Sequence, residues 1–107
     1  MKTLLLFIAA GLSLSAQDSN GKRLFEKDGC YECHGFAAQG GRDGPRLAAT
    51  SLSLQAFTRY VRRPFGAMPA FTAKVLSDQE LTDIYTYLKS FPAAKPAKDI
   101  PLLHQIQ

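Results

Sequence analysis

The sequence predicts a small all-helical protein. Three stretches repeat apolar residues at spacings of three and four, the period of a helix with one buried face, and no stretch alternates like a half-buried strand. The chain has 107 residues, of which 46% are hydrophobic and 21% charged, so it fits one globular domain. We therefore expect about three to four short helices around a single core.

The first 16 residues are expected to lie outside this domain. Lys2 precedes an apolar run from Leu4 to Leu14, and small residues end that run at Ala16. This order is typical of a secretory signal peptide, cleaved here after Ala16. A retained membrane anchor is the alternative, but a span needs roughly 20 apolar residues, about twice what this run provides. We expect no stable membrane insertion after cleavage.

The first helix of the domain is predicted over residues 19–28, with Ser19 or Asn20 as its N-cap. Gly21 lies one turn before the apolar Phe25. Glycine within a helix costs about 1 kcal/mol relative to alanine, so its presence indicates a close approach of another helix. A frayed first turn is the simpler alternative.

A second helix is predicted over residues 52–63, where Phe57 and Val61 fall on one face and Pro64 ends the pattern. The last helix opens at Ser77, which with Glu80 forms a capping-box sequence.

The apolar face of this last helix, which extends to Phe91, should pack on the first helix. Ile84 and Tyr87 are then expected near Gly21 and Phe25. Residues 93–107 are rich in Ala, Lys and Pro, and we expect a tail that is laid over the surface or partly disordered.

The two cysteines of the chain lie in the sequence Cys30-Tyr31-Glu32-Cys33-His34. Cys-x-x-Cys-His is the attachment sequence of a c-type haem. Two intervening residues let both thiols add to neighbouring vinyl groups of one porphyrin, and the histidine that follows lies where it can bind the iron. Cys30 and Cys33 are then covalent tethers, and His34 is the proximal ligand of one haem c.

Three other readings of this motif remain open. A redox dithiol usually sits between a strand and a helix. A structural zinc site needs four ligands, and the chain offers only the distant His104 beyond the motif. A plain disulfide fits an oxidising compartment but does not require the adjacent histidine.

Two further stretches fit a haem site. A metal-bound histidine normally donates its other ring N–H to an oxygen, and the carbonyl of Pro45, in a stiff Gly-Pro turn, is the expected partner of His34. Met68 stands between Pro64 and Pro69, where a stiff loop can hold its sulfur against a metal. A thioether suits the iron of an electron carrier, so Met68 is the expected sixth ligand, with His104 as its rival.

Together these features resemble a class I c-type cytochrome of the small bacterial, monohaem kind. The resemblance covers the whole mature chain before the tail, and it rests on Gly21 with Phe25, Cys30 to His34, Gly44 to Leu47, Arg62 to Pro69, and Leu81 to Leu88. It implies a cytochrome c fold over residues 17–92, with crossing N- and C-terminal helices, His/Met-ligated haem and attachment of the haem in the periplasm. The tail, residues 93–107, has no counterpart in the family pattern.

The expected function is one-electron transfer between redox partners, because an iron bound on both sides has no position left for a substrate. Arg46, Arg62 and Arg63 are candidate partners of the haem propionates, since arginine matches carboxylates well. Without Lys2 the chain carries 12 basic and 9 acidic side chains, which favours acidic docking surfaces on the partners. No dense basic stretch suggests nucleic acid binding.

Two other functions remain open. The chain could be the haem subunit of a periplasmic dehydrogenase or oxidase complex, in which case it is still a carrier and not itself the enzyme. It could also be a haem-based ligand sensor in which Met68 is a labile ligand.

Overall fold

The computed structural model describes residues 4–106. All regular secondary structure in this range is helical. No strand occurs among these residues, so the prediction of an all-helical protein is confirmed. The elements in chain order are α1 (Leu4–Lys27), α2 (Cys30–His34), α3 (Leu54–Arg62), α4 (Asp78–Ser90) and two short 3₁₀ helices, η1 (Ala97–Asp99) and η2 (Pro101–Gln105).

Helix α1 is much longer than predicted. It begins at Leu4 and runs without a break past Ser19, so the expected N-cap at Ser19 or Asn20 is wrong for this chain. Ser19 instead donates its hydroxyl to the carbonyl of Ala16 at 3.0 Å, within the helix. A cap is needed only where backbone N–H groups lack partners, and the preceding turn supplies those partners here.

The predicted cleavage after Ala16 falls inside this helix and remains a prediction. Of the expected leader, residues 1–3 lie outside the part that the structure describes. Within the described part, no helix combines the length and the apolar character needed to cross a bilayer.

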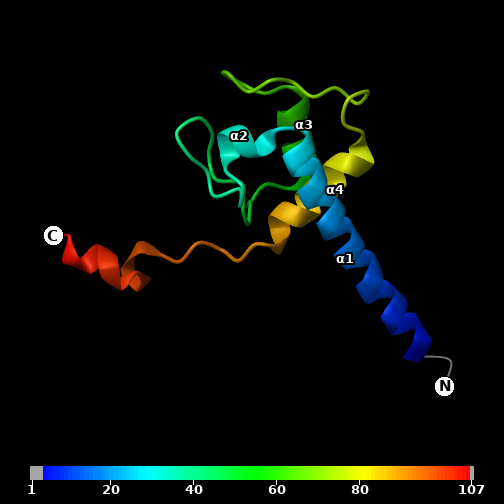
Figure 1. The fold of residues 1–107 in the computed structure, drawn as a ribbon, viewed down its shortest axis with the longest axis horizontal. Helices are drawn as coiled ribbons and strands as arrows, with labels where there is room; N and C mark the ends of the chain where they lie inside the picture. The colour runs from blue at the N-terminus through cyan, green and yellow to red at the C-terminus, as the bar shows by residue number, and fades with distance from the viewer. Residues whose placement is uncertain (1–3, 107) are drawn as a thin grey trace.

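The core forms where α1 crosses α4 (Figure 1). Gly21 lies so close to α4 that a Cβ atom there would overlap the Asp83 carbonyl and come within 2.7 Å of the Tyr87 Cβ. One turn later, the rings of Phe25 and Tyr87 meet at 5.7 Å between centroids. The expected packing of Gly21 and Phe25 against the last helix is therefore confirmed.

A buried carboxylate lies beside this crossing. Asp83 of α4 is only 7% exposed. Its two oxygens accept hydrogen bonds from Asn20 of α1 at 2.6 Å and from Gln79 at 3.0 Å. Buried polar groups need such partners, so Asn20 serves the contact between helices, not the start of one.

Helices α3 and α4 each begin directly after a serine that caps the helix with its side chain. Ser53 accepts a hydrogen bond from the Ala56 amide, so α3 starts at Leu54, two residues after the predicted start. Ser77 and Glu80 form both halves of the predicted capping box of α4. Helix α3 packs on α4, and α2 follows α1 directly.

The tail leaves the end of α4 and runs away from the helices (Figure 1). Its helices η1 and η2 contact each other and no other helix of the described chain, so this part of the tail is not laid over the helices; the alternative of a partly disordered tail stays a prediction. Ala, Lys and Pro dominate its first half and offer little apolar surface to bind the core. Leu102, Leu103 and Ile106 are exposed.

Replacing Gly21 with alanine should destabilise the protein, because the added methyl group has no space between α1 and α4. Overpacking of this kind typically costs about 1–3 kcal/mol of the free energy of unfolding. Chemical denaturation of the haem-loaded protein measures the loss. Gly41→Ala is the control, since a Cβ there would make only an ordinary 3.8 Å contact with the Cys33 carbonyl. Equal losses in the two variants would contradict the close approach.

Candidate haem site

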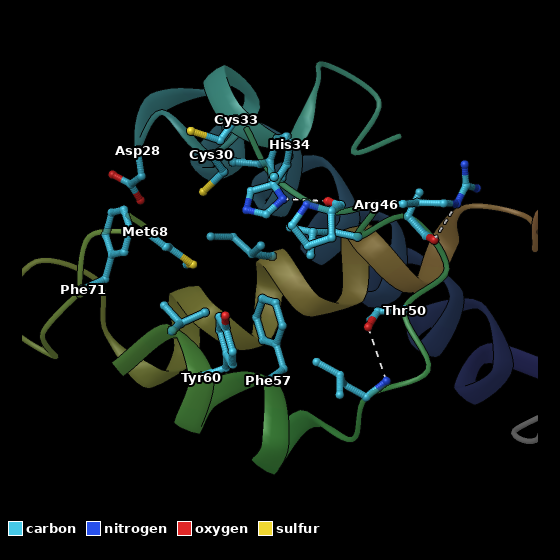
Figure 2. Close-up of a pocket in the computed structure, with 18 of the residues that line it drawn as sticks. Asp28, Cys30, Cys33, His34, Arg46, Thr50, Phe57, Tyr60, Met68 and Phe71 are labelled. Atoms are coloured by element: carbon cyan, nitrogen blue, oxygen red, sulfur yellow. Dashed lines mark hydrogen bonds between the residues drawn. The ribbon is translucent and has the colours of Figure 1, made fainter. Parts of the chain in front are cut away.

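Most of the residues expected to form the site line one cavity of about 1260 Å³ (Figure 2): Cys30, Cys33, His34, Pro45, Arg46 and Met68. Its walls come from the end of α1, from α2, α3 and α4, from two loops (residues 43–52 and the segment between Phe65 and Phe71) and from the start of the tail at Ala93 and Ala94. Its most buried wall residues are apolar: Phe25, Ala48, Phe57, Val61, Leu76, Leu81 and Ile84. A cavity of this size and character suits a large, flat and mostly apolar group.

Helix α2 carries three of the expected site residues on a single turn. Gly29, at φ 77°, ends the preceding turn, and Gly35, at φ 83°, ends α2. Cys30, Cys33 and His34 all line the cavity. Both cysteines are free thiols, so the disulfide reading gains no support.

The thiol of Cys30 has its pKa raised to about 11, chiefly by burial and then by the nearby Asp28 carboxylate. A thiolate is the nucleophilic form of cysteine, so in this environment the thiol is a poor nucleophile at neutral pH. Once the sulfur is a thioether it no longer titrates.

His34 is buried, and its ring orientation is fixed by the following loop. Its Nδ1 lies 2.7 Å from the carbonyl oxygen of Pro45, as expected from the sequence. A carbonyl can only accept, so Nδ1 donates to it, and in the neutral imidazole Nε2 keeps its lone pair. Gly44 allows this contact, because a Cβ there would lie 2.9 Å from both the His34 ring and the Cys33 carbonyl.

Met68 enters the same cavity from the loop after α3, and Figure 2 shows its thioether and the His34 ring projecting into a common space. Its side chain is half-buried and packs against the hydrophobic core. The rival ligand His104 lies in the projecting tail, where its Nε2 is 2.9 Å from the Lys98 carbonyl, and it does not line the cavity. The structure therefore brings His34 and Met68 together and leaves His104 apart.

The three arginines expected near the propionates have different surroundings. Arg46 lines the cavity, and its guanidinium donates to the carbonyls of Ala48 at 3.2 Å and Pro92 at 3.4 Å. Arg62 does not line the cavity, because its guanidinium is engaged with two backbone carbonyls and a carboxylate. Arg63 is exposed and also lies outside the cavity wall.

Three hydroxyl-bearing residues of the wall, Thr50, Ser51 and Tyr60, were not singled out from the sequence. Tyr60 of α3 lines the cavity beside Phe57 (Figure 2). Thr50 lines it as well, and its hydroxyl accepts from the Leu52 amide at 3.3 Å. Only the spacing of Tyr60 from Phe57 in the helix could have indicated that Tyr60 lies at the cavity wall. Nothing in the loop sequence indicates this for Thr50.

These residues fit a covalently held haem. Two thiols and an imidazole with a free Nε2 lie on one turn, a thioether faces the same space, and the walls are apolar. Nitrogen and thioether sulfur are ligands that haem iron takes in electron carriers. In the described part of the chain, no three His, Cys, Asp or Glu side chains come together as a metal site, so a structural zinc site finds no support there.

Comparison with known proteins decides the family. A family model described as cytochrome C oxidase, cbb3-type, subunit III matches residues 16–88. The chain belongs to this cytochrome c family. As a member it carries covalently bound haem c and transfers electrons.

The chain is similar to three characterised members of the cytochrome c group. It is 38% identical to the cytochrome c subunit of 4-cresol dehydrogenase [hydroxylating] from Pseudomonas putida, over 82% of this chain and 75% of that protein. It is 32% identical to cytochrome c-555 from Methylococcus capsulatus (strain ATCC 33009 / NCIMB 11132 / Bath), over 65% of this chain and 58% of that protein.

The third relative is the cytochrome c subunit of menaquinol:cytochrome c reductase from Bacillus subtilis (strain 168). It is 29% identical over 71% of this chain, which covers 29% of that protein. No solved structure matches the chain.

Gly44→Ala should push the loop away from α2 and lengthen the contact between His34 and Pro45, because the new methyl group would meet the imidazole and the Cys33 carbonyl. We expect a loss of about 1–3 kcal/mol in the free energy of unfolding, the usual cost of overpacking. Urea unfolding of the haem-loaded protein tests this. Gly41→Ala in the same loop should have little effect, and unchanged stability in Gly44→Ala would show that the loop yields without cost.

Proposed function

We propose that this protein is an exported one-electron carrier in which Cys30 and Cys33 tether one haem, and His34 and Met68 bind its iron from opposite sides. The observation that carries the proposal is the contact of the His34 Nδ1 with the Pro45 carbonyl, which leaves the Nε2 lone pair to a cavity that Met68 also enters. The Pro45 carbonyl orients the imidazole and raises its basicity.

When bound, the haem would supply the one-electron redox chemistry. The chain's own residues would hold the group: the His34 imidazole and the Met68 thioether would bind its iron and leave no position for substrate or oxygen. The thioether favours the reduced iron and raises the reduction potential. The apolar wall would exclude water from the bound group.

Arg46 is the arginine best placed to meet a haem propionate. It lies at the cavity wall, and the carbonyls of Ala48 and Pro92 hold its guanidinium in place. Arginine and carboxylate form strong charge-assisted hydrogen bonds. Arg62 and Arg63 are less suited to this role, because neither reaches the cavity.

Residues 1–16 act in the proposal as a cleaved leader that directs the protein to the periplasm, where residues 17–92 form the cytochrome c domain and residues 93–107 the tail. The net positive charge favours redox partners with acidic docking surfaces. Permanent attachment to an enzyme is the second candidate, because two of the relatives are named as cytochrome c subunits, of a dehydrogenase and of a reductase. A permanent subunit co-purifies with its catalytic partner, whereas a free carrier elutes alone.

Met68→Ala tests the closed coordination. The wild-type reduced protein should give a low-spin spectrum that does not respond to carbon monoxide at neutral pH, because both axial positions are filled. The variant should bind carbon monoxide and have a lower reduction potential, since it lacks the thioether. A carbon monoxide response of the wild type would support a ligand sensor instead, and an unchanged variant would remove Met68 from the site.

Removal of the two thiols tests the tethers. Cys30→Ala and Cys33→Ala should each leave the haem on one thioether with a reduced yield, and the double variant should lose its haem on denaturation. Denaturing gel electrophoresis with haem staining reads the outcome. Haem that stays attached to the double variant under denaturing conditions would exclude Cys30 and Cys33 as tethers.

A further inference from the structure

The loop that carries Met68 has few contacts at its tip. Phe65 is 79% exposed, and its main ring neighbour is Tyr60, at 6.1 Å between centroids. Gly66 adopts φ 69°, and a Cβ atom built on it would meet no heavy atom within 4 Å. Because the tip is held so weakly, the position of Met68 depends on how the loop is fastened where it returns to α3.

The loop returns at Phe71, and both backbone polar groups of Phe71 are bound to the end of α3. Its amide donates to the carbonyl of Val61 at 3.1 Å. Its carbonyl accepts from the Arg62 Nη1 at 2.9 Å. These two hydrogen bonds close residues 63–70 into a loop whose two ends touch.

The same guanidinium binds two more acceptors. Nη1 of Arg62 also donates to the carbonyl of Leu76 at 2.7 Å, and Nη2 contacts the Asp78 carboxylate at 2.7 Å. Phe71 and Leu76 both line the cavity. One side chain therefore joins the end of α3, two points of the cavity wall and the first residue of α4.

Of the contacts of Arg62, the hydrogen bonds to the carbonyls of Phe71 and Leu76 contribute most. The Asp78 side chain is 83% exposed, whereas that of Arg62 is 19% exposed. Ion pairs with an exposed partner contribute little, because water and salt screen them and the side chains lose freedom. A charged donor shared between two backbone carbonyls in a partly buried place contributes more.

We propose that Arg62 is a positioning residue for Met68, which clamps the base of the ligand loop and so keeps the thioether on the iron. The inference rests on the proposed role of Met68 as axial ligand. Without the clamp, only the bond from the Phe71 amide to Val61 fastens the loop there. The loop then opens more often, and a competing ligand gains access in proportion to the open fraction.

Imidazole is the probe, because it binds ferric haem only where Met68 has left the iron. Its affinity is measured by absorbance titration of the oxidised, haem-loaded protein at neutral pH. We expect Arg62→Ala and Arg62→Lys to raise the imidazole affinity about tenfold, the equilibrium equivalent of one lost charge-assisted hydrogen bond. Lysine keeps the positive charge but lacks the planar fork that reaches several acceptors.

Two controls separate the clamp from charge. Asp78→Ala removes only the exposed ion pair and should change the imidazole affinity less than about twofold. Arg59→Ala removes an exposed positive charge from the same last turn of α3 and should also leave it unchanged. The titrations are made at a temperature where all variants are folded. A general loss of stability would then not raise the imidazole affinity of the Arg62 variants alone.

The outcomes distinguish this inference from the proposed function. If Met68→Ala binds imidazole readily while both Arg62 variants match the wild type, the clamp is wrong and the ligand assignment stands. If Met68→Ala itself matches the wild type, the ligand assignment fails. Should the Arg62 variants not fold, hydrogen exchange of the wild type decides: the guanidinium protons of Arg62 must exchange far more slowly than those of the exposed Arg59, and equal rates would overturn the clamp.

Discussion

The crossing of α1 and α4 at Gly21 determines where every other part of the site can lie. Helix α2 follows α1 after two residues, so the cysteines and His34 are placed by the direction of α1. Leu81 and Ile84 of α4 form part of the cavity wall beneath them. The Asn20–Asp83 hydrogen bond adds a polar contact to an otherwise apolar junction, which favours a single arrangement of the two helices.

Helix α4 also holds the loop of residues 49–52, which closes the cavity on the side opposite Met68. The Ala49 amide donates to the Leu88 carbonyl at 2.8 Å, and the Lys89 ammonium donates to the Thr50 carbonyl at 3.0 Å. The Tyr85 hydroxyl donates to the Leu52 carbonyl at 2.8 Å. A loop without regular structure thus obtains partners for its backbone from the last turns of one helix, as buried and half-buried polar groups require.

Local sequence signals predicted the parts of this protein that local interactions form. The capping box at Ser77, the end of α3 before Pro64 and the motif from Cys30 to His34 are each decided within a few residues. The contact of Pro45 with His34 could be anticipated, because an imidazole that binds a metal needs an oxygen at its other nitrogen.

The long-range arrangements could not be read from the sequence. Arg62 and Arg63 are neighbours with the same charge, yet only Arg62 points toward Phe71 and Leu76, and this depends on the path of a loop with no regular pattern. The wrong prediction of an N-cap at Ser19 or Asn20 has a similar cause. Ser19 has the residue type of a cap, and only the structure shows that the turns before it are helical. In the proposed assignment, three of the groups that hold the haem lie within five consecutive residues, whereas Met68 reaches the iron only after α3 and its loop are in place. The proximal side can therefore form on a chain that is still unfolded, and six-coordination of the iron reports that the tertiary structure is complete.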